Sequence, residues 1–231
     1  MERDPLVSVI IPAYNCERYL ADAIDSVLGQ CYRPIEIIVV DDASTDGSAA
    51  VARRFPGIRY TDQPHGGIGA ARNTGSDLAV GEFLAFIDAD DLWVQDKLNR
   101  QTAAFEADGS LDVVFGQVQQ FVSPELPADV KNRIKCPSDP APCRLPGAML
   151  IRRRAFFRVG YFSGPIGEVL DWAARASELP LKSAMLPEVV LKRRLHATNS
   201  VILHGNPQAE YARYLKAGLD RRRAASARRN A

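Results

Sequence analysis

The 231-residue sequence is poor in the residues that build disulfide frameworks and zinc sites. It has four cysteines, none in a C-x-x-C pair, and three histidines, which excludes a disulfide-stapled miniprotein and argues against a zinc site of the usual kind. The apolar run at residues 6–11 is too short for a signal peptide or a membrane span. We therefore expect a cytoplasmic protein whose cysteines are small buried hydrophobic residues.

The sequence also lacks an excess of charge of either sign. Its 29 basic and 28 acidic residues leave a net charge of +1, so nothing in the overall charge attracts nucleic acid, and we expect no nucleic-acid partner. Basic residues do gather locally, at 152–154, at 192–194 and in the tail at 221–229. We interpret these runs as solvated faces, with at most weak peripheral contact between the tail and the inner face of a membrane.

The first half of the sequence alternates apolar, β-branched runs with segments of helical spacing. This alternation predicts an α/β fold with a mostly parallel central sheet and helices on both faces. The expected strands are 6–11, 35–40, 58–61 and 83–87, and the expected helices are 17–28, 44–55, 70–80 and 94–107.

The second half is less regular, because six prolines fall within residues 123–146. We interpret that segment as a long loop, followed by a strand at 147–151, a helix at 169–179 and a strand at 189–195. The expected division is a first half at 1–105, a second half of the same domain at 106–207, and a basic helix or tail at 208–231.

Carboxylates gather where two of the expected strands end. Asp41 and Asp42 follow one strand, and Asp88, Asp90 and Asp91 follow another. Ligands of open α/β sheets bind outside the carboxyl ends of strands, and Mg²⁺ or Mn²⁺ prefers carboxylate and phosphate oxygens. The alternative is that the aspartates cap turns and helices, which explains Asp41 equally well but not three carboxylates in four residues.

Four segments of the first half resemble motifs of family 2 glycosyltransferases, which have the GT-A fold. They are VSVIIPAYN at 7–15, IIVVDDASTDGS at 37–48, GAARNTG at 69–75 and GEFLAFIDADD at 81–91. Their order and spacing are those of the family, and the close resemblance covers residues 7 to about 105.

The resemblance implies a nucleotide-diphosphate sugar as donor, with Tyr14 stacked on a uracil-like base and Asp42 accepting a hydrogen bond from that base. It implies Mn²⁺ or Mg²⁺ as cofactor, held by Asp90 or Asp91, with His196 of a late Arg-x-His segment as a further ligand. The residues implied to bind the nucleotide sugar are Pro12, Ala13, Tyr14, Asn15, Asp42, Gly67, Arg72, Asn73, Asp88, Ala89 and Asp90.

The catalytic base departs from the family pattern, which has a Glu-Asp pair early in a helix and an arginine six residues after the aspartate. Here Arg175 is in place, but Val169 stands at the aspartate position. Glu168 and Asp171 are the substitutes, three residues apart on one helical face, and Asp171 is favoured because Glu168 is also suited to cap the helix.

The resemblance thus implies an inverting, metal-dependent glycosyltransferase that uses a UDP-sugar, with residues 1–105 as the donor-binding half and 106–207 as the acceptor and catalytic half of the same domain. The proline-rich segment at 123–146 is then either a plain loop or an acceptor-side flap. Its acceptor is unknown and could be a glycan, a lipid phosphate, a peptide or a small molecule. Two alternatives stay open. A nucleotidyltransferase would need a glycine-rich loop where residues 12–16 stand, and a non-catalytic sugar-nucleotide-binding protein would explain Val169.

Overall fold

The computed structural model describes residues 4–163 and 168–196, and the expected tail at 208–231 lies outside them. The strands are β1 (Val7–Ala13), β2 (Ile35–Asp41), β3 (Arg59–Asp62), β4 (Phe83–Phe86), β5 (Leu92–Trp93), β6 (Val113–Val122), β7 (Ala141–Cys143), β8 (Leu150–Arg152) and β9 (Ser183–Leu195). The helices are α1 (Leu20–Leu28), α2 (Ser48–Ala52), α3 (Ile68–Leu78), α4 (Lys97–Ala107), α5 (Ala128–Lys131), α6 (Arg153–Val159) and α7 (Glu168–Glu178), with one 3₁₀ turn, η1 (Pro146–Ala148).

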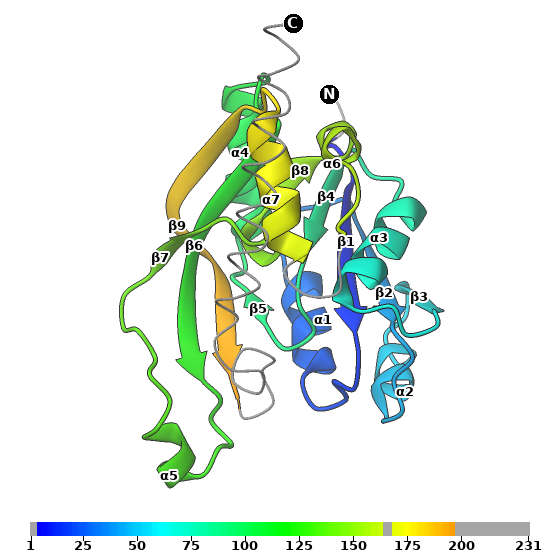
Figure 1. Cartoon of the computed structure of the whole chain (residues 1–231), viewed down its shortest axis with the longest axis vertical. Coiled ribbons are helices and arrows are strands. Elements are labelled where there is room, and N and C mark those ends of the chain that lie inside the picture. Colours follow the sequence, from blue (N-terminus) through cyan, green and yellow to red (C-terminus); the bar gives the residue numbers. More distant parts are fainter. Residues whose placement is uncertain (1–3, 164–167, 197–231) are drawn as a thin grey trace, which may run out of the picture.

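The strands of both halves of the chain form one nine-stranded sheet (Figure 1). Its order is β3-β2-β1-β4-β8-β6-β9-β5, with β7 paired to β6. Strands β3, β2, β1 and β4 pair in parallel, and β8 is antiparallel to both β4 and β6. Because β6 and β9 also pair in parallel, β1, β2, β3, β4, β6 and β9 run in one direction, which confirms the expected α/β fold with a mostly parallel sheet.

Helices cover both faces of this sheet, as the sequence predicts. In β1, Val7, Val9 and Ile11 face the core beneath α1 and α4, whereas Ile10 faces the core beneath α3, α6 and α7. Strands β2 and β4 alternate in the same way. Strands buried on both faces read as continuous apolar runs, which is why the sequence reveals them.

Three of the expected helices are shorter than predicted: α4 starts at Lys97 rather than at 94, and loop hydrogen bonds replace the first turns of α1 and α2. Helix α1 starts at Leu20 rather than at 17, and α2 spans Ser48–Ala52 rather than 44–55. The backbone N–H groups of Asn15 and Glu17 donate to Ser44 Oγ and Asp46 Oδ2, so these residues join two loops instead of winding into helices.

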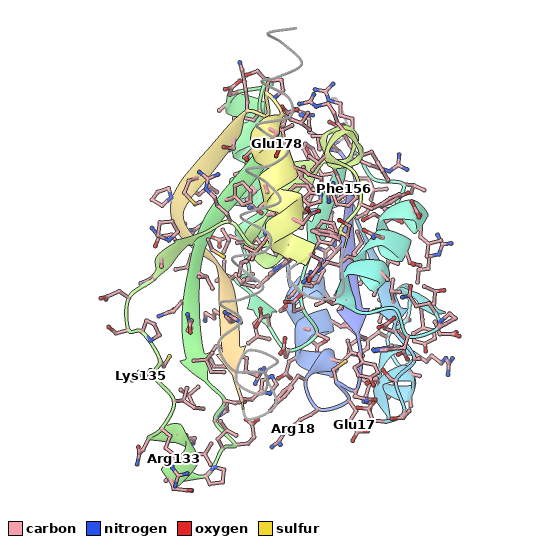
Figure 2. All side chains as sticks on the ribbon, viewed as in Figure 1. Glu17, Arg18, Arg133, Lys135, Phe156 and Glu178 are labelled. Atoms are coloured by element: carbon pink, nitrogen blue, oxygen red, sulfur yellow. The ribbon has the colours of Figure 1, made fainter. Side chains whose placement is uncertain are left out.

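The sequence pattern does not predict β5 in the first half, nor β6 and α6 in the second. Strand β6 also bounds the proline-rich segment, which is not wholly a loop, since it contains α5 and β7. The expected strand at 147–151 is a 3₁₀ turn followed by β8, and β9 starts six residues before the expected 189. In Figure 1 the segment that carries α5 extends beyond the body of the sheet, and Figure 2 places Arg133 and Lys135 on it.

The prediction of buried cysteines is right only for Cys143. Cys31 is exposed, and Cys16 and Cys136 are half-buried. Among the described residues, no helix is long and apolar enough to span a membrane.

Candidate functional site

Asp42 organises the loop that leads into α3. Its carboxylate is only 2% exposed and accepts hydrogen bonds from the backbone N–H groups of Gly66 and Gly67, each at 2.8 Å, and from Gln63 Nε2 at 2.7 Å. His65 Nδ1 lies 2.9 Å from Asp42 Oδ2. Three donors from this loop therefore hold the carboxylate in place, with the His65 ring beside it.

Glycine suits position 67 because of the backbone conformation there, not because a side chain would lack space. Its φ is +84°, and a Cβ built on it would meet nothing within 4 Å. A side chain at Gly67 would therefore strain the backbone whose N–H group bonds Asp42.

Tyr14, the expected stacking partner of a nucleobase, is 51% exposed at the end of β1. Its ring lies 4.6 Å from that of His65, at an interplanar angle of 36°. The His65 ring thus lies against Tyr14 while its Nδ1 faces Asp42. These are the two contacts that the resemblance predicts for the nucleobase of the donor. The neighbouring Pro12 and Ala13 are buried, Ala13 within the apolar core, as is Ala89.

Arg72 joins two carboxylates that are far apart in the sequence. Its side chain is 3% exposed, Nη2 lies 2.7 Å from Asp88 Oδ1, and Nη1 lies 3.0 Å from Glu168 Oε1. Arg72 Nε is buried and forms no hydrogen bond within the described residues. Glu168 also packs on α3, since a Cβ on Gly69 would lie 3.0 Å from Glu168 Cγ. The structure therefore places Glu168 next to a residue expected to contact the donor.

Two of the expected site residues hold the backbone around Phe162. Asn73 Nδ2 donates to Phe162 O at 2.8 Å, and Asn73 Oδ1 accepts from Phe162 N at 2.9 Å. Asp171 Oδ2 accepts from Ser163 Oγ at 2.7 Å and from Arg175 Nε at 2.9 Å. Asn73 and Asp171 thus hold Phe162 and Ser163, which follow α6, and in these contacts Asp171 faces Arg175 rather than Arg72.

Asp90 and His196 meet at the carboxyl edge of the sheet. His196 Nε2 lies 2.9 Å from Asp90 Oδ2. This is hydrogen-bonding distance, and it is also the separation of adjacent ligands around an octahedral ion whose bonds are about 2.1 Å long. No cluster of three or more His, Cys, Asp or Glu side chains suited to a metal occurs in the described part of the chain. Mg²⁺-type ions need only one or two protein ligands beside substrate phosphates, so this pair fits such an ion.

Asp91, the other expected metal ligand, lies beneath the surface. It is 5% exposed, and its Oδ1 accepts a hydrogen bond from the backbone N–H of Arg194 at 2.9 Å. Burial raises the pKa of Asp91 well above its usual value, and the nearby carboxylates of Asp88 and Asp90 add to the effect. Asp91 therefore anchors β9 to the loop that carries Asp90.

The structure adds residues that the sequence does not single out. The Tyr19 ring lies 4.6 Å from that of His196, and the Arg194 guanidinium lies 4.8 Å from the centre of the Tyr19 ring. Tyr19 also donates a hydrogen bond to Glu125, 106 residues away. Hydrogen bonds from Ser123 and Tyr19 lower the pKa of Glu125 to about 2. Such long-range pairs leave no local pattern by which a sequence could reveal them.

This fold, a mostly parallel sheet with Asp42, Asp88 and Asp90 beyond the carboxyl ends of its strands, is that of GT-A-type glycosyltransferases. Residues 8–162 match the model of the glycosyl transferase family 2, and the chain belongs to that family. It is 38% identical over 113 residues to glycosyltransferase GlyA of Streptococcus pneumoniae, covering 46% of this chain and 16% of GlyA. It is 41% identical over 103 residues to TuaG of Bacillus subtilis, a putative teichuronic acid biosynthesis glycosyltransferase, covering 42% of this chain and 40% of TuaG.

Solved structures share the fold at lower identity. S. aureus TarS residues 1–349, in complex with UDP-GlcNAc, superposes with a TM-score of 0.70 at 19% identity, covering 92% of this chain and 65% of that one. The mannosyltransferase PcManGT from Pyrobaculum calidifontis, in complex with GDP-Man and Mn²⁺, gives a TM-score of 0.61 at 24% identity, covering 85% and 59%. The chain thus spans less than two thirds of these proteins.

Proposed function

We propose that this chain transfers a sugar from a nucleotide-diphosphate sugar, with a UDP-sugar as the first candidate, to a hydroxyl acceptor with inversion. The observation that carries the proposal is the Asp90–His196 pair, 2.9 Å apart and close in sequence to the Arg72-bound Asp88. The donors in the TarS and PcManGT complexes are a UDP-sugar and a GDP-sugar, which supports this donor class. We propose a cytoplasmic location, where the free cysteines stay reduced.

The nucleobase of the donor would take the place of the His65 side chain. Tyr14 offers an exposed ring for stacking, and Asp42 offers an acceptor that His65 now faces. Because His65 is 58% exposed, its side chain can leave without disturbing the core. The backbone N–H groups of Gly66 and Gly67 would keep the Asp42 carboxylate in place when it accepts a hydrogen bond from the nucleobase N–H.

Asp90 and His196 would hold Mn²⁺ or Mg²⁺, which when bound neutralises charge on the departing diphosphate. Asp91 would not contact the ion; its hydrogen bond to the backbone N–H of Arg194 would hold the loop that carries Asp90. One carboxylate and one imidazole suit Mn²⁺ better than Mg²⁺, because Mg²⁺ strongly prefers oxygen ligands.

Glu168 is the better candidate for the base, although the helix pattern favours Asp171. Glu168 lies against Arg72 and hence near Asp88, whereas Asp171 is engaged with Ser163 and Arg175. The acceptor oxygen would bond to the anomeric carbon from the side opposite the diphosphate. The bond to the diphosphate oxygen would break with its electron pair, and Glu168 would take the hydroxyl proton.

A second candidate function is sugar-nucleotide binding without turnover. Val169 at the usual base position favours it, as does the engagement of Glu168 by Arg72. The two functions share the donor site and differ only in the chemistry at the start of α7.

Calorimetry with UDP, GDP and their sugar conjugates, each with Mn²⁺ and with EDTA, tests the donor site. We expect Mn²⁺-dependent binding of UDP that Asp90→Asn weakens at least about tenfold. Asp62→Asn is the matched control, since it removes the same charge from an exposed position on β3. Equal UDP binding by the Asp90 variant and the wild type would refute the metal assignment.

Hydrolysis of the bound UDP-sugar tests the base without knowledge of the acceptor, because water can take the acceptor's place. We expect Glu168→Gln to lower hydrolysis about a hundredfold or more while UDP binding is kept. Asp171→Asn should have the smaller effect. If the wild type binds the donor but does not hydrolyse it, and Val169→Asp creates that activity, the non-catalytic alternative is correct.

A further inference from the structure

A groove of about 480 Å³ lies at the opposite end of the sheet from the donor site. It is lined by Val80, Gly81, Glu82, Arg152, Arg153, Arg154 and Phe157. Residues 80–82 precede β4, and Arg152 pairs with Phe83 at the amino end of that strand, whereas Asp88 and Asp90 follow its carboxyl end. Figure 1 shows α6, which forms one wall, at the other end of the molecule from α5.

The lining of this groove is strongly basic. Three arginines face one carboxylate, that of Glu82, so the lining carries a formal charge of +2. Glu82 is already matched by Arg152, whose Nη1 lies 2.6 Å from Glu82 Oε1. Arg153 and Arg154 form no ion pair with any side chain in the ranges 4–163 and 168–196. The unbalanced charge therefore belongs to these two residues.

The Arg153 guanidinium packs against an aromatic ring. Its Cζ lies 5.0 Å from the centre of the Phe157 ring, and its Nε is buried without a hydrogen-bond partner in the described structure. The covered Nε leaves the two terminal nitrogens as the donors available to a ligand. Guanidinium groups fixed by stacking lose little entropy when they bind an oxyanion with two parallel hydrogen bonds.

The remaining wall of the groove is apolar. It is formed by Val80, which is 72% exposed, and by Phe157, against whose ring the Arg153 guanidinium packs. The backbone N–H groups of Val80 and Gly81 donate to Glu36 Oε1, which leaves the arginine side chains as the donors for a ligand in this groove. The volume exceeds what an isolated phosphate ion needs, so an apolar substituent attached to the phosphate has room against Val80.

We propose that this groove is a second anion site, which binds a phosphate monoester through Arg153 and Arg154 and its apolar substituent through Val80 and Phe157. The phosphate could belong to a lipid headgroup or to a soluble phosphate ester. The groove adjoins neither Asp90 nor Arg72 in the sequence or along the strands. The proposal therefore does not depend on sugar transfer.

The test titrates the full chain with inorganic phosphate in the presence of EDTA and follows the Arg Nε–H resonances by NMR. We expect saturable binding that moves the Arg153 resonance, and a loss of affinity of at least about tenfold in Arg153→Gln/Arg154→Gln. Arg133→Gln/Lys135→Gln removes the same charge from the segment near α5 and should bind like the wild type (Figure 2). The Arg153/Arg154 variant should bind UDP with Mn²⁺ unchanged, which separates this site from the donor site.

Sedimentation with vesicles identifies the source of the phosphate. Pelleting with phosphatidic acid but not with phosphatidylcholine vesicles, lost in Arg153→Gln/Arg154→Gln, supports the site and assigns it to a lipid headgroup. Saturable phosphate binding without pelleting supports the site and assigns it to a soluble ester. If the Arg153 resonance does not move with phosphate, or if both double variants lose affinity equally, the proposal is wrong.

Discussion

Lys97, at the start of α4, is a fully buried ammonium group whose titration we expect to control stability. Its Nζ donates to Gln101 Oε1 at 2.6 Å and lies 4.7 Å from the centre of the Trp93 ring. No carboxylate pairs with it among the residues that the structure describes. Burial therefore lowers the pKa of Lys97 from 10.5 to about 7.

The direction of the pH effect follows from this lowered pKa. Between pH 7 and 10.5 the unfolded chain binds a proton at Lys97 that the folded chain does not bind, so stability rises with pH across this window. Below pH 7 both states bind the proton and the dependence ends. At about 1.4 kcal/mol per pKa unit, the penalty at neutral pH reaches about 5 kcal/mol as an upper bound.

The perturbation is Lys97→Met, which keeps the length of the side chain and removes the charge. We expect the variant to gain about 2–4 kcal/mol relative to the wild type when the pH falls from 10 to 7, measured by urea unfolding. Lys192→Met, at an exposed position on β9, is the control and should not change the pH dependence. Parallel pH profiles for wild type and Lys97→Met would refute the reasoning, because Lys97 would then titrate alike in both states.

Two further substitutions test the packing around the site and the sheet. Tyr19→Leu should weaken Mn²⁺ binding in the presence of UDP several-fold, because it removes the ring that packs against His196. Tyr19→Phe keeps the ring and should preserve the affinity. Equal loss in both variants would mean that the hydroxyl, which donates to Glu125, matters instead. Gly75→Ala should destabilise the fold by about 1–3 kcal/mol, since its Cβ would lie 2.4 Å from Ile10 Cγ2. A Cβ on Gly109 would meet nothing within 4 Å, so Gly109→Ala should be near neutral. Thermal unfolding of both glycine variants measures the difference.

The sequence predicts the fold well where one residue pattern decides it. The doubly buried strands β1, β2 and β4 are nearly continuous apolar runs, a pattern that is typical of strands buried on both faces of a sheet. Strand β6 escapes prediction because Gly116, Gln117, Gln119 and Gln120 interrupt its apolar run. Gly116 is needed for packing between strands that are distant in the sequence, since a Cβ there would lie 2.5 Å from the Val190 side chain on β9.

The candidate site shows the same division between local and long-range information. The carboxylates were visible because they follow strands, but their partners lie on distant segments. Arg72 meets Glu168 across 96 residues, and Asp90 meets His196 across 106. A sequence pattern can therefore propose which residues gather at the edge, but it cannot choose between Glu168 and Asp171 as the base.

The partners of each carboxylate divide the acidic residues of the edge into two kinds. Asp42 and Asp91 accept hydrogen bonds from backbone N–H groups, so displacing them means refolding a loop. Asp90 and Glu168 meet side chains, His196 and Arg72, which can change partners when a ligand arrives without any change in the backbone. Substitution of the first kind should therefore lower stability and donor binding together. Substitution of the second kind should lower binding or turnover with less change in the free energy of unfolding, above all at Asp90, whose side chain is 29% exposed, because Glu168 also balances the buried Arg72 guanidinium.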